Sequence, residues 1–267
     1  MMRIDQLLVQ RGLASTRSQA QRLIGAGVRC RSAGVWRVIV KNGELVPPDC
    51  EIDLQGGAEA RFVSRGGLKL EGALAQAGVR PAGWRCLDVG QSTGGFTDCL
   101  LAHGAAQVTG VDVGHGQLHP RLRSDARVRV LEGVNARHLD ASVLIAAGAD
   151  QTGAEGQAGT HFDLIVGDLS FISLTLVLPA LLPLLGSGGQ LLLLVKPQFE
   201  LQPADIGKGG IVRDPALYAQ VEQRLRQACA ALGLAVHHWL PSPITGGDGN
   251  REFFLHAARA ATTCDTP

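Results

Sequence analysis

Apolar runs and helical spacings alternate along the chain from residue 85 onward. Short apolar runs of the kind that form buried strands are followed by stretches in which apolar residues recur every three or four positions. Such alternation indicates crossover connections, and therefore an α/β fold with a mainly parallel sheet covered on both faces. The expected strands are 85–89, 107–111, 128–131, 162–167, 190–195, 234–240 and 252–258, and the expected helices are 94–103, 117–123, 140–147, 174–185 and 215–231.

The end of this pattern carries two further expectations. No helical spacing separates the last two strands, so we expect them to pair antiparallel at one edge of the sheet. The most apolar stretch, residues 171–195, is interrupted by Pro179, Pro183 and the sequence GSGG at 186–189. A membrane-spanning helix needs about 20 unbroken apolar residues, so this stretch predicts a helix, a turn and a buried strand.

Residues 148–160 are small and polar, which is typical of a mobile surface insertion.

The first 54 residues have a different pattern. Residues 3–27 show two short segments with helical spacing, the second opened by Ser15 or Thr16. Alternating valines separated by glycine and proline turns then predict short strands. Residues 54–65 have little periodicity, and helical spacing returns at 66–78 with Leu68, Leu74 and Ala75 expected to face inward. We therefore expect a small α+β domain over 1–60, a linker over 61–65 and the α/β domain over 66–267.

Positive charge is concentrated near the amino-terminal end. Residues 1–41 carry eight Lys or Arg and one acidic residue, Asp5, although the net charge of the whole chain is only +1. This excess favours a polyanionic partner, with a solvated charged face as the alternative. The segment RIDQLLVQRGLASTRSQAQRLIGAGVRC resembles the S-four-type RNA-binding domain. This resemblance favours RNA over DNA or a membrane as the partner. RNA contacts are expected from Arg3, Arg11, Arg17, Arg22, Arg29 and Arg65.

Residues 86–97, CLDVGQSTGGFT, predict a buried strand, a glycine-rich turn and the start of a helix. Glycines allow the backbone to approach a ligand closely, and an acid at the strand end adds a polar contact. Thr93 or Thr97 can cap the helix. A glycine-rich turn without a ligand is the alternative. We expect cofactor contacts from Asp88, Gly90, Ser92, Thr93, Gly94 and Gly95.

Further polar residues follow the other expected strands, where ligands bind in a doubly wound sheet. Asp112 lies 24 residues beyond Asp88, close to the offset of an acid that binds ribose hydroxyls, and Asn135 is placed to meet an adenine edge. The alternatives are a turn residue for Asp112 and a loop cap for Asn135. Three charged residues stand at the ends of later strands: Asp168, Lys196 and Glu252. A lysine in such a place can also simply extend its ammonium group to solvent.

The six cysteines show no CxxC pair and no His/Cys ligand spacing. Neither a zinc site nor a disulfide framework is indicated, so we expect reduced thiols and no bound metal. The start of the chain, MMRIDQLLVQRG, lacks the apolar core of a signal peptide. A cytoplasmic location follows as an expectation, and the sequence specifies no oligomeric state.

Eight segments together resemble one family: RGGLKL, LDVGQSTGGFTD, VDVGHGQL, GVNAR, GDLSFISL, LVKPQFE, GKGGIVRD and SPITGGDGNREFF. From Arg3 to about Ala258 the chain resembles the TlyA (hemolysin A) family of rRNA methyltransferases, whose catalytic part is similar to the FtsJ-like ribose methyltransferases. The resemblance implies a Rossmann-like class I methyltransferase fold with a mostly parallel seven-stranded sheet. It also implies S-adenosylmethionine as cofactor, ribosomal RNA or ribosomal subunits as partner, and methylation of a ribose 2′-hydroxyl, by resemblance that of a cytidine.

The same resemblance implies a catalytic tetrad of Lys69, Asp168, Lys196 and Glu252, with Asp168 also near the cofactor. A ribose 2′-hydroxyl is a poor nucleophile at neutral pH, so the site must remove its proton or stabilise the developing alkoxide. Two ammonium groups and two carboxylates can do both without a metal. The family often has Ala where this chain has Gln91, a change expected to crowd the cofactor loop.

Several other functions fit the sequence less well. After Asp168 the chain continues Leu-Ser-Phe instead of the Asn-Pro-Pro-aromatic signature of amino methyltransferases, which disfavours attack by an exocyclic amine. A noncatalytic RNA-binding or ribosome-assembly protein has no need for two lysines and two acids at strand ends. A membrane-active hemolysin needs an amphipathic or spanning segment, and none is found in the sequence. A DNA or protein methyltransferase is the remaining alternative.

Overall fold

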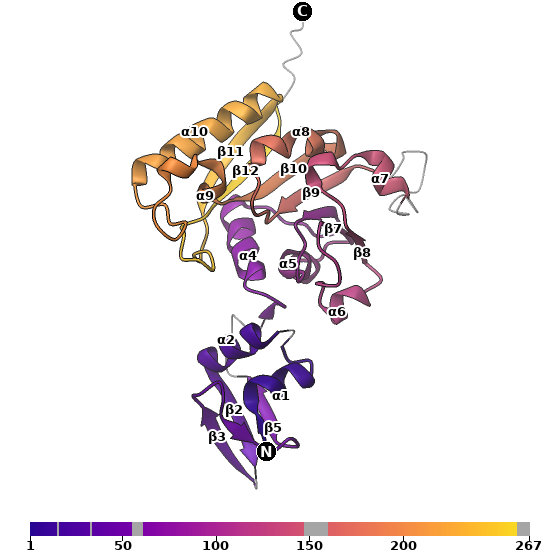
Figure 1. Cartoon of the computed structure of the whole chain (residues 1–267). Coiled ribbons are helices and arrows are strands. Elements are labelled where there is room, and N and C mark those ends of the chain that lie inside the picture. Colours follow the sequence, from indigo (N-terminus) through magenta and orange to yellow (C-terminus); the bar gives the residue numbers. More distant parts are fainter. Residues whose placement is uncertain (15, 33, 55–60, 147–159, 261–267) are drawn as a thin grey trace, which may run out of the picture. The chain divides into compact units, whose positions relative to one another are not determined.

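The computed structural model describes residues 1–14, 16–32, 34–54, 61–146 and 160–260 (Figure 1). The chain divides into two compact units, Met1–Leu68 and Lys69–Pro267, and the division falls within α4 (Gly66–Ala77). Almost all of the expected insertion at 148–160 lies outside the described residues, as does the segment before the expected linker. The domain boundaries at 60 and 66 therefore stay predictions.

The first unit is a small α+β fold with its own core. Helices α1 and α2 pack on a three-stranded antiparallel sheet of order β3-β2-β5, and β1 pairs with β4. The second helix begins as predicted, because the Thr16 side chain accepts a hydrogen bond from the Gln19 amide at 3.1 Å. The elements are β1 (Met2–Arg3), α1 (Ile4–Gln10), α2 (Arg17–Gly27), β2 (Val28–Ser32), β3 (Val35–Ile39), β4 (Leu45–Val46) and β5 (Glu51–Leu54).

Two of the cysteines correct the expectation of reduced thiols. Cys30 in β2 and Cys50 just before β5 are paired as a disulfide, with Cα atoms 6.2 Å apart. Their spacing in the sequence matches no signature, because it is the antiparallel pairing of β2 with β5 that brings the two side chains together in the core. Cys86, Cys99 and Cys229 are buried free cysteines, as expected.

A seven-stranded sheet of order β11-β12-β10-β9-β6-β7-β8 forms the centre of the second unit. In this sheet β12 runs antiparallel to both of its neighbours, and the other neighbouring strands are parallel. The mostly parallel α/β fold and the antiparallel pairing of the last two strands are confirmed. The strands are β6 (Arg85–Val89), β7 (Gln107–Asp112), β8 (Val128–Glu132), β9 (Phe162–Gly167), β10 (Leu185–Val195), β11 (Leu234–Pro241) and β12 (Phe253–Arg259).

Helices cover both faces of this sheet, with α4 and α5 on one face and α8 and α10 on the other (Figure 1). The face under α10 holds a large apolar core, in which Val221 and Leu225 pack among buried strand residues. In α4 the prediction for Ala75 is wrong, because that residue is exposed while Leu70 and Leu74 are buried. The remaining helices are α5 (Gly95–Ala102), α6 (Pro120–Arg123), α7 (Ala141–Ala146), α8 (Leu178–Leu181), α9 (Pro197–Glu200) and α10 (Pro215–Ala231), with 3-10 turns η1 (Ala136–His138), η2 (Leu174–Leu176), η3 (Leu182–Leu184) and η4 (Pro203–Asp205).

Residues 174–195 differ from the predicted helix, turn and strand. Pro179 and Pro183 lack the N–H of a continuous helix, and the segment forms the three short pieces η2, α8 and η3. The predicted turn is part of β10, which begins at Leu185 and shifts its register with β9 before Gln190. A bulge-like irregularity in a strand therefore replaces the glycine turn.

Candidate active site

The charged residues predicted at the strand ends share one edge of the sheet. Asp168 follows β9 and Lys196 follows β10, whereas Glu252 precedes β12, which runs in the opposite direction. The ladder between β10 and β12 ends at the pair Val195 and Phe253, so Lys196 and Glu252 occupy the next positions beyond it. Strand direction alone thus brings these three side chains to the carboxyl ends of the parallel strands.

Two ion pairs unite the four residues of the predicted tetrad. Lys69 Nζ, from α4, lies 2.6 Å from Glu252 Oε2, and Lys196 Nζ lies 2.5 Å from Asp168 Oδ1 and 2.8 Å from Ser170 Oγ. Burial raises the pKa of Glu252, an effect that Lys69 opposes and Asp168 reinforces, so the two pairs interact electrostatically. The Lys69–Glu252 pair is the more deeply buried, while Asp168 keeps 24% of its side-chain surface exposed.

A cavity of about 510 Å³ opens beside Asp168. Its walls are mostly apolar, with Val111, Val134 and Leu169 among them, and a few polar groups converge on it. This combination of size and lining is typical of a pocket for a small molecule or cofactor. Five residues predicted to bind a cofactor line the cavity: Gly90, Ser92, Asp112, Asn135 and Asp168.

Two of these polar residues also shape the loops around the cavity. Asp112 Oδ2 accepts a hydrogen bond from the Ser92 amide and Oδ1 one from the Gly114 amide, both at 2.7 Å. Each carboxylate oxygen retains a second lone pair for a ligand hydroxyl. Asn135 Oδ1 accepts from the Arg137 amide at 3.0 Å and caps η1, so the loop-cap interpretation holds, with the Nδ2 group left for a ligand.

Four other predicted cofactor residues do not line the cavity: Asp88, Thr93, Gly94 and Gly95. Asp88 is fully buried, and its Oδ2 accepts a hydrogen bond from Thr97 Oγ1 at 2.7 Å. The prediction that Thr93 or Thr97 caps the next helix is wrong, because Gly94 occupies the N-cap of α5 without a side-chain bond. Asp88 and Thr97 instead join β6 to α5 beneath the turn.

The glycines of the turn are required by neighbouring protein atoms. Gly90 has φ +80°, and a Cβ there would lie 2.7 Å from the carbonyl oxygen of Asp168. Gly94 has φ +93°, and its Cβ would meet the side chains of Leu118 and Leu122 at 2.6 and 2.4 Å. Such φ values favour glycine, and at Gly90 the contact with a backbone oxygen adds to this preference. Close packing between β6, β9 and α6 therefore explains both glycines.

Gln91 lies in the core and is not among the residues that line the cavity. Its Nε2 donates a hydrogen bond to Thr97 Oγ1 at 2.9 Å, and its side chain fills the space beside Gly110, where a Cβ would come within 1.9 Å of it. The expectation that Gln91 crowds the cofactor loop is therefore wrong. The side chain instead packs between Gly110 in β7 and Thr97 in α5.

Sequence reasoning missed the segment after Asp168 as part of the cavity wall. Phe171 is 89% exposed with φ +62°, and its ring lies 4.9 Å from that of Phe199. Buried Glu200 holds this segment, accepting hydrogen bonds from Ser173 Oγ at 2.6 Å and from the Leu174 amide at 2.8 Å. The available signal was the pair of motifs GDLSFISL and LVKPQFE, which these contacts join.

The buried Asp88 makes stability depend on pH. Burial raises the pKa of Asp88 to about 7, against the hydrogen bond from Thr97. Because the folded state then binds the proton more tightly than the unfolded state, the free energy of unfolding falls as pH rises from about 4 to about 7. Asp88→Asn keeps the acceptor for Thr97 and removes this dependence.

We expect the stability of Asp88→Asn relative to wild type to increase between pH 5 and pH 8. The measurement is urea unfolding of both proteins at the two pH values. Equal changes in stability for both proteins would contradict the raised pKa of Asp88.

The arginines predicted to bind RNA are largely engaged within the first unit. Arg3 and Arg17 each place an Nη2 atom 3.0 Å from Oδ2 of Asp5, which is fully buried. Hydrogen bonds from Arg3, opposed by burial and reinforced by Arg17, lower the pKa of Asp5. These two arginines therefore balance a buried carboxylate as well as contributing positive charge at the surface.

The other four arginines predicted to bind RNA differ in their polar contacts and burial. Arg11 donates hydrogen bonds to the carbonyl oxygens of Pro48 and Cys50 at 2.5 and 2.6 Å, and Arg29 lies 2.6 Å from Asp53. Arg65 is half-buried. Arg22 is also half-buried but has no polar side-chain partner among the described residues, so its charge is the most available of the set.

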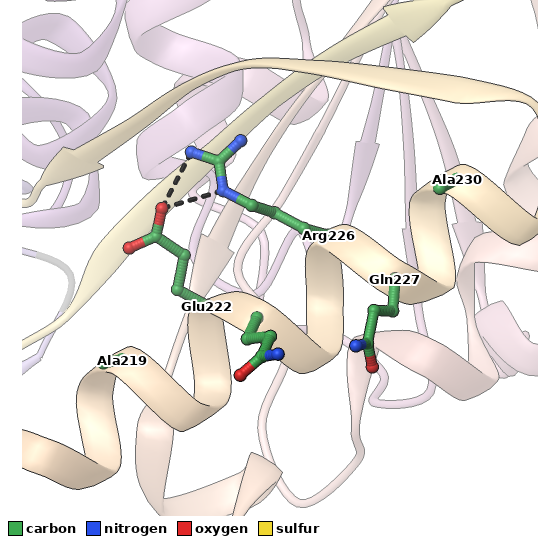
Figure 2. A pocket seen from close by; sticks show the side chains of 6 residues that line it. Ala219, Glu222, Arg226, Gln227 and Ala230 are labelled. Carbon is green, nitrogen blue, oxygen red and sulfur yellow. Dashed lines mark hydrogen bonds and ion pairs between the residues drawn. The ribbon is translucent and has the colours of Figure 1, made fainter.

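A second hollow lies along one side of α10 (Figure 2). Glu222 and Arg226 point toward each other and form an ion pair at 2.7 Å, while Gln227 points away from them (Figure 2). Arg226 also donates to the carbonyl oxygen of Val236 at 3.4 Å. The two charged groups that line this hollow, Glu222 and Arg226, are already paired with each other, so the cavity beside Asp168 is the stronger candidate for chemistry.

Comparison with known families identifies this fold as that of a methyltransferase. Residues 62–259 match the model of the FtsJ-like methyltransferase family, and residues 2–27 match the S4 domain. The chain belongs to the FtsJ-like methyltransferase family. It is 43% identical over 253 residues to the 16S/23S rRNA (cytidine-2'-O)-methyltransferase TlyA of Mycobacterium tuberculosis, covering 95% of this chain and 88% of the relative.

Two other relatives carry the name hemolysin. The chain is 35% identical to Hemolysin A of Brachyspira hyodysenteriae, over 96% of this chain and 99% of that protein. A solved structure of a candidate hemolysin from Streptococcus thermophilus matches with a TM-score of 0.72 and 39% identity, covering 97% of this chain and 88% of that chain. In the described residues no helix is long and apolar enough to cross a membrane, and no cluster of three or more His, Cys, Asp or Glu side chains could hold a metal.

Proposed function

We propose that this protein transfers a methyl group from S-adenosylmethionine to the 2′-hydroxyl of a cytidine in ribosomal RNA, acting on ribosomal subunits in the cytoplasm. The observation that carries the proposal is the meeting of two Lys–carboxylate pairs beside a cofactor-sized cavity. The name of the Mycobacterium tuberculosis relative supports the ribose position and the nucleotide. The FtsJ-like family supports methyl transfer.

The cavity fits this cofactor by the chemistry of its walls. Asp112 offers a carboxylate to ribose hydroxyls, Asn135 offers its amide to the adenine edge, and the apolar side chains between them suit the flat base. The bound cofactor supplies a methyl group activated by a sulfonium charge. Gly90 and Ser92 contact the cofactor directly. Asp88, Gly94 and Gly95 contribute by fixing the conformation of the turn.

The residues of the tetrad have distinct proposed roles. Lys196 contacts the attacking 2′-oxygen and serves as its base or stabilises its developing negative charge. Asp168 orients Lys196, as their ion pair indicates. Lys69 and Glu252 complete the charge network from the more buried side. Holding the oxygen in line with the methyl group contributes up to about 7 to 11 kcal/mol of barrier reduction.

The first unit is the proposed anchor for RNA. Met1–Leu68 carries ten Lys or Arg and six Asp or Glu, whereas Lys69–Pro267 carries fifteen and eighteen. Because the second unit is net negative, electrostatic attraction to a polyanion depends on the first. The match of residues 2–27 to the S4 domain supports the same assignment.

Arg22 provides a specific test of RNA binding. Arg22→Ala removes a cation without a polar partner in the described chain, so we expect weaker RNA binding and a salt slope reduced by about 1. The measurement is RNA affinity at several salt concentrations. Arg127→Ala, at an arginine paired with Asp125 in the second unit, is the matched control. An unchanged slope for Arg22→Ala would remove this residue from the RNA contact.

The proposed activity is tested by incubating the purified protein with labelled S-adenosylmethionine and separated ribosomal subunits. We expect label on a ribose 2′-oxygen of ribosomal RNA, located by nuclease digestion and mass spectrometry. RNA binding without label would favour the noncatalytic ribosome-assembly function. Label on DNA or protein instead of RNA would identify a different methyltransferase.

A further inference from the structure

The backbone ladder that brings two catalytic residues together ends just before them. β10 and β12 pair up to Val195 and Phe253, and Lys196 and Glu252 lie beyond this last pair. Pro197 has no N–H with which to continue the ladder. The chain then turns into α9 on one side and comes from the loop before Glu252 on the other. Other contacts must therefore hold these two segments together.

A network of side-chain hydrogen bonds centred on Asn250 continues where the ladder stops. Asn250 is 1% exposed. Its Oδ1 accepts a hydrogen bond from the Val212 amide at 2.9 Å, and its Nδ2 donates to the Gly210 carbonyl at 2.9 Å and to Asp248 Oδ2 at 2.8 Å. The residue thereby binds the loop before α10 to the turn that precedes Glu252.

Asp248 links this network to the segment that carries Lys196. Its Oδ1 accepts a hydrogen bond from the Asn250 amide at 3.0 Å, and its Oδ2 accepts one from Gln198 Nε2 at 3.0 Å. Burial opposes ionisation, but hydrogen bonds from Asn250 and the charge of Lys196 lower the pKa of Asp248. Asp248 is therefore an ionised carboxylate within the electrostatic reach of Lys196.

Lys196 nevertheless pairs with a different carboxylate. Its ion pair is with Asp168 at 2.5 Å, and it forms none with Asp248 in the structure. The turn before Glu252 is also closely packed, since a Cβ at Gly246 would lie 2.7 Å from Asp248 Oδ1 and 2.8 Å from Glu252 Oε1. Three hydrogen bonds and this close packing hold the Asp248 carboxylate in place.

Resting on the proposed methyl transfer, we propose that Asn250 is a positioning residue that holds Asp248 on Gln198 and away from Lys196. Lys196 thus remains paired with Asp168 and directed at the 2′-oxygen. Without the Asn250 side chain, Asp248 Oδ2 loses one of its two hydrogen bonds, and the turn is no longer bound to the loop before α10. The Asp248 carboxylate can then move toward Lys196 and compete with Asp168 for its ammonium group. A displaced ammonium group no longer meets the reacting oxygen.

The test is a pair of substitutions and their combination. Asn250→Ala should lower kcat by about 10²-fold, the cost of a misplaced catalytic group, with little change in KM for S-adenosylmethionine or RNA. In the background of Asp248→Asn, which has no charge to compete for Lys196, the same substitution should cost far less. Because Asn250 also donates a hydrogen bond to Asp248, the same cycle is measured by urea unfolding. Coupling in kcat that exceeds the coupling in stability distinguishes competition for Lys196 from simple loosening of the turn.

Gln198→Ala provides a second route to the same result, because it removes another restraint on Asp248 without emptying a buried site. It should lower kcat less than Asn250→Ala does, and Asp248→Asn should again relieve the loss. Melting curves identify any variant that fails to fold, and Gln198→Ala then carries the test. An equal loss in both Asp248 backgrounds, or wild-type kcat in both variants, would overturn the proposal. A wild-type protein without methyl transfer would instead overturn the proposed function.

Discussion

Replacing Lys196 by alanine should lower methyl transfer to ribosomal RNA by about 10²- to 10³-fold or more, the usual cost of losing a group that stabilises a developing oxyanion. The ammonium group lies 2.5 Å from Asp168 at the edge of the proposed cofactor cavity. Lys196 is not one of the residues that line this cavity, so S-adenosylmethionine should still bind. Single-turnover kinetics and calorimetric titration of the cofactor measure the two effects separately.

Lys208→Ala is the matched control for this experiment. Lys208 is an exposed lysine in the same unit, without an ion pair among the described residues. At saturating RNA its replacement should leave kcat close to that of wild type. Turnover by Lys196→Ala at the wild-type rate would refute the catalytic role of Lys196. A loss of cofactor binding in this variant would show instead that Lys196 acts in binding S-adenosylmethionine.

Glu252→Gln should reduce both stability and activity. The substitution leaves Lys69, with 10% of its side chain exposed, facing a neutral group 2.6 Å away. Breaking a buried ion pair on one side destabilises by about 3 to 5 kcal/mol, because the remaining charge is uncompensated. Urea unfolding measures the loss of stability, and methyl transfer under folded conditions measures the loss of activity.

The double variant Lys69→Met with Glu252→Gln separates the two effects. Removing both charges should restore most of the stability, since no buried charge is left without a partner. Activity should stay low, because the charge network beside Asp168 is still incomplete. Recovery of methyl transfer together with stability would show that this pair only supports the fold. Wild-type stability in Glu252→Gln alone would show that the pair does not stabilise it.

Strand direction explains why the sequence could predict so much of the site. Asp168, Lys196 and Glu252 each stand next to a recognisable apolar strand, and the carboxyl ends of parallel strands meet at one edge. Lys69 is different, since it lies on a helix whose position depends on tertiary packing. Its role came from the motif RGGLKL, and the structure places its ammonium group on Glu252.

Contacts between distant segments account for the predictions that failed. Nothing local to Cys30 indicates that β5 will bring Cys50 beside it. Similarly, the basic pattern of the first 41 residues gives no sign that Asp5 is buried between Arg3 and Arg17. Charge can be counted from a sequence, but its availability depends on which side chains fold against each other.

The contact of Gln91 with Gly110 ties a position in the turn after β6 to a position in β7. With glutamine at 91 the space above Gly110 is full, so Gly110→Ala should be tolerated poorly in this chain. An alanine at position 91 leaves that space open and gives up the hydrogen bond to Thr97. Among relatives, residues 91 and 110 should therefore vary as a pair, with a larger residue at 110 appearing only where 91 is small. A chimera that takes the turn sequence from a relative must therefore take residues 91 and 110 from the same relative.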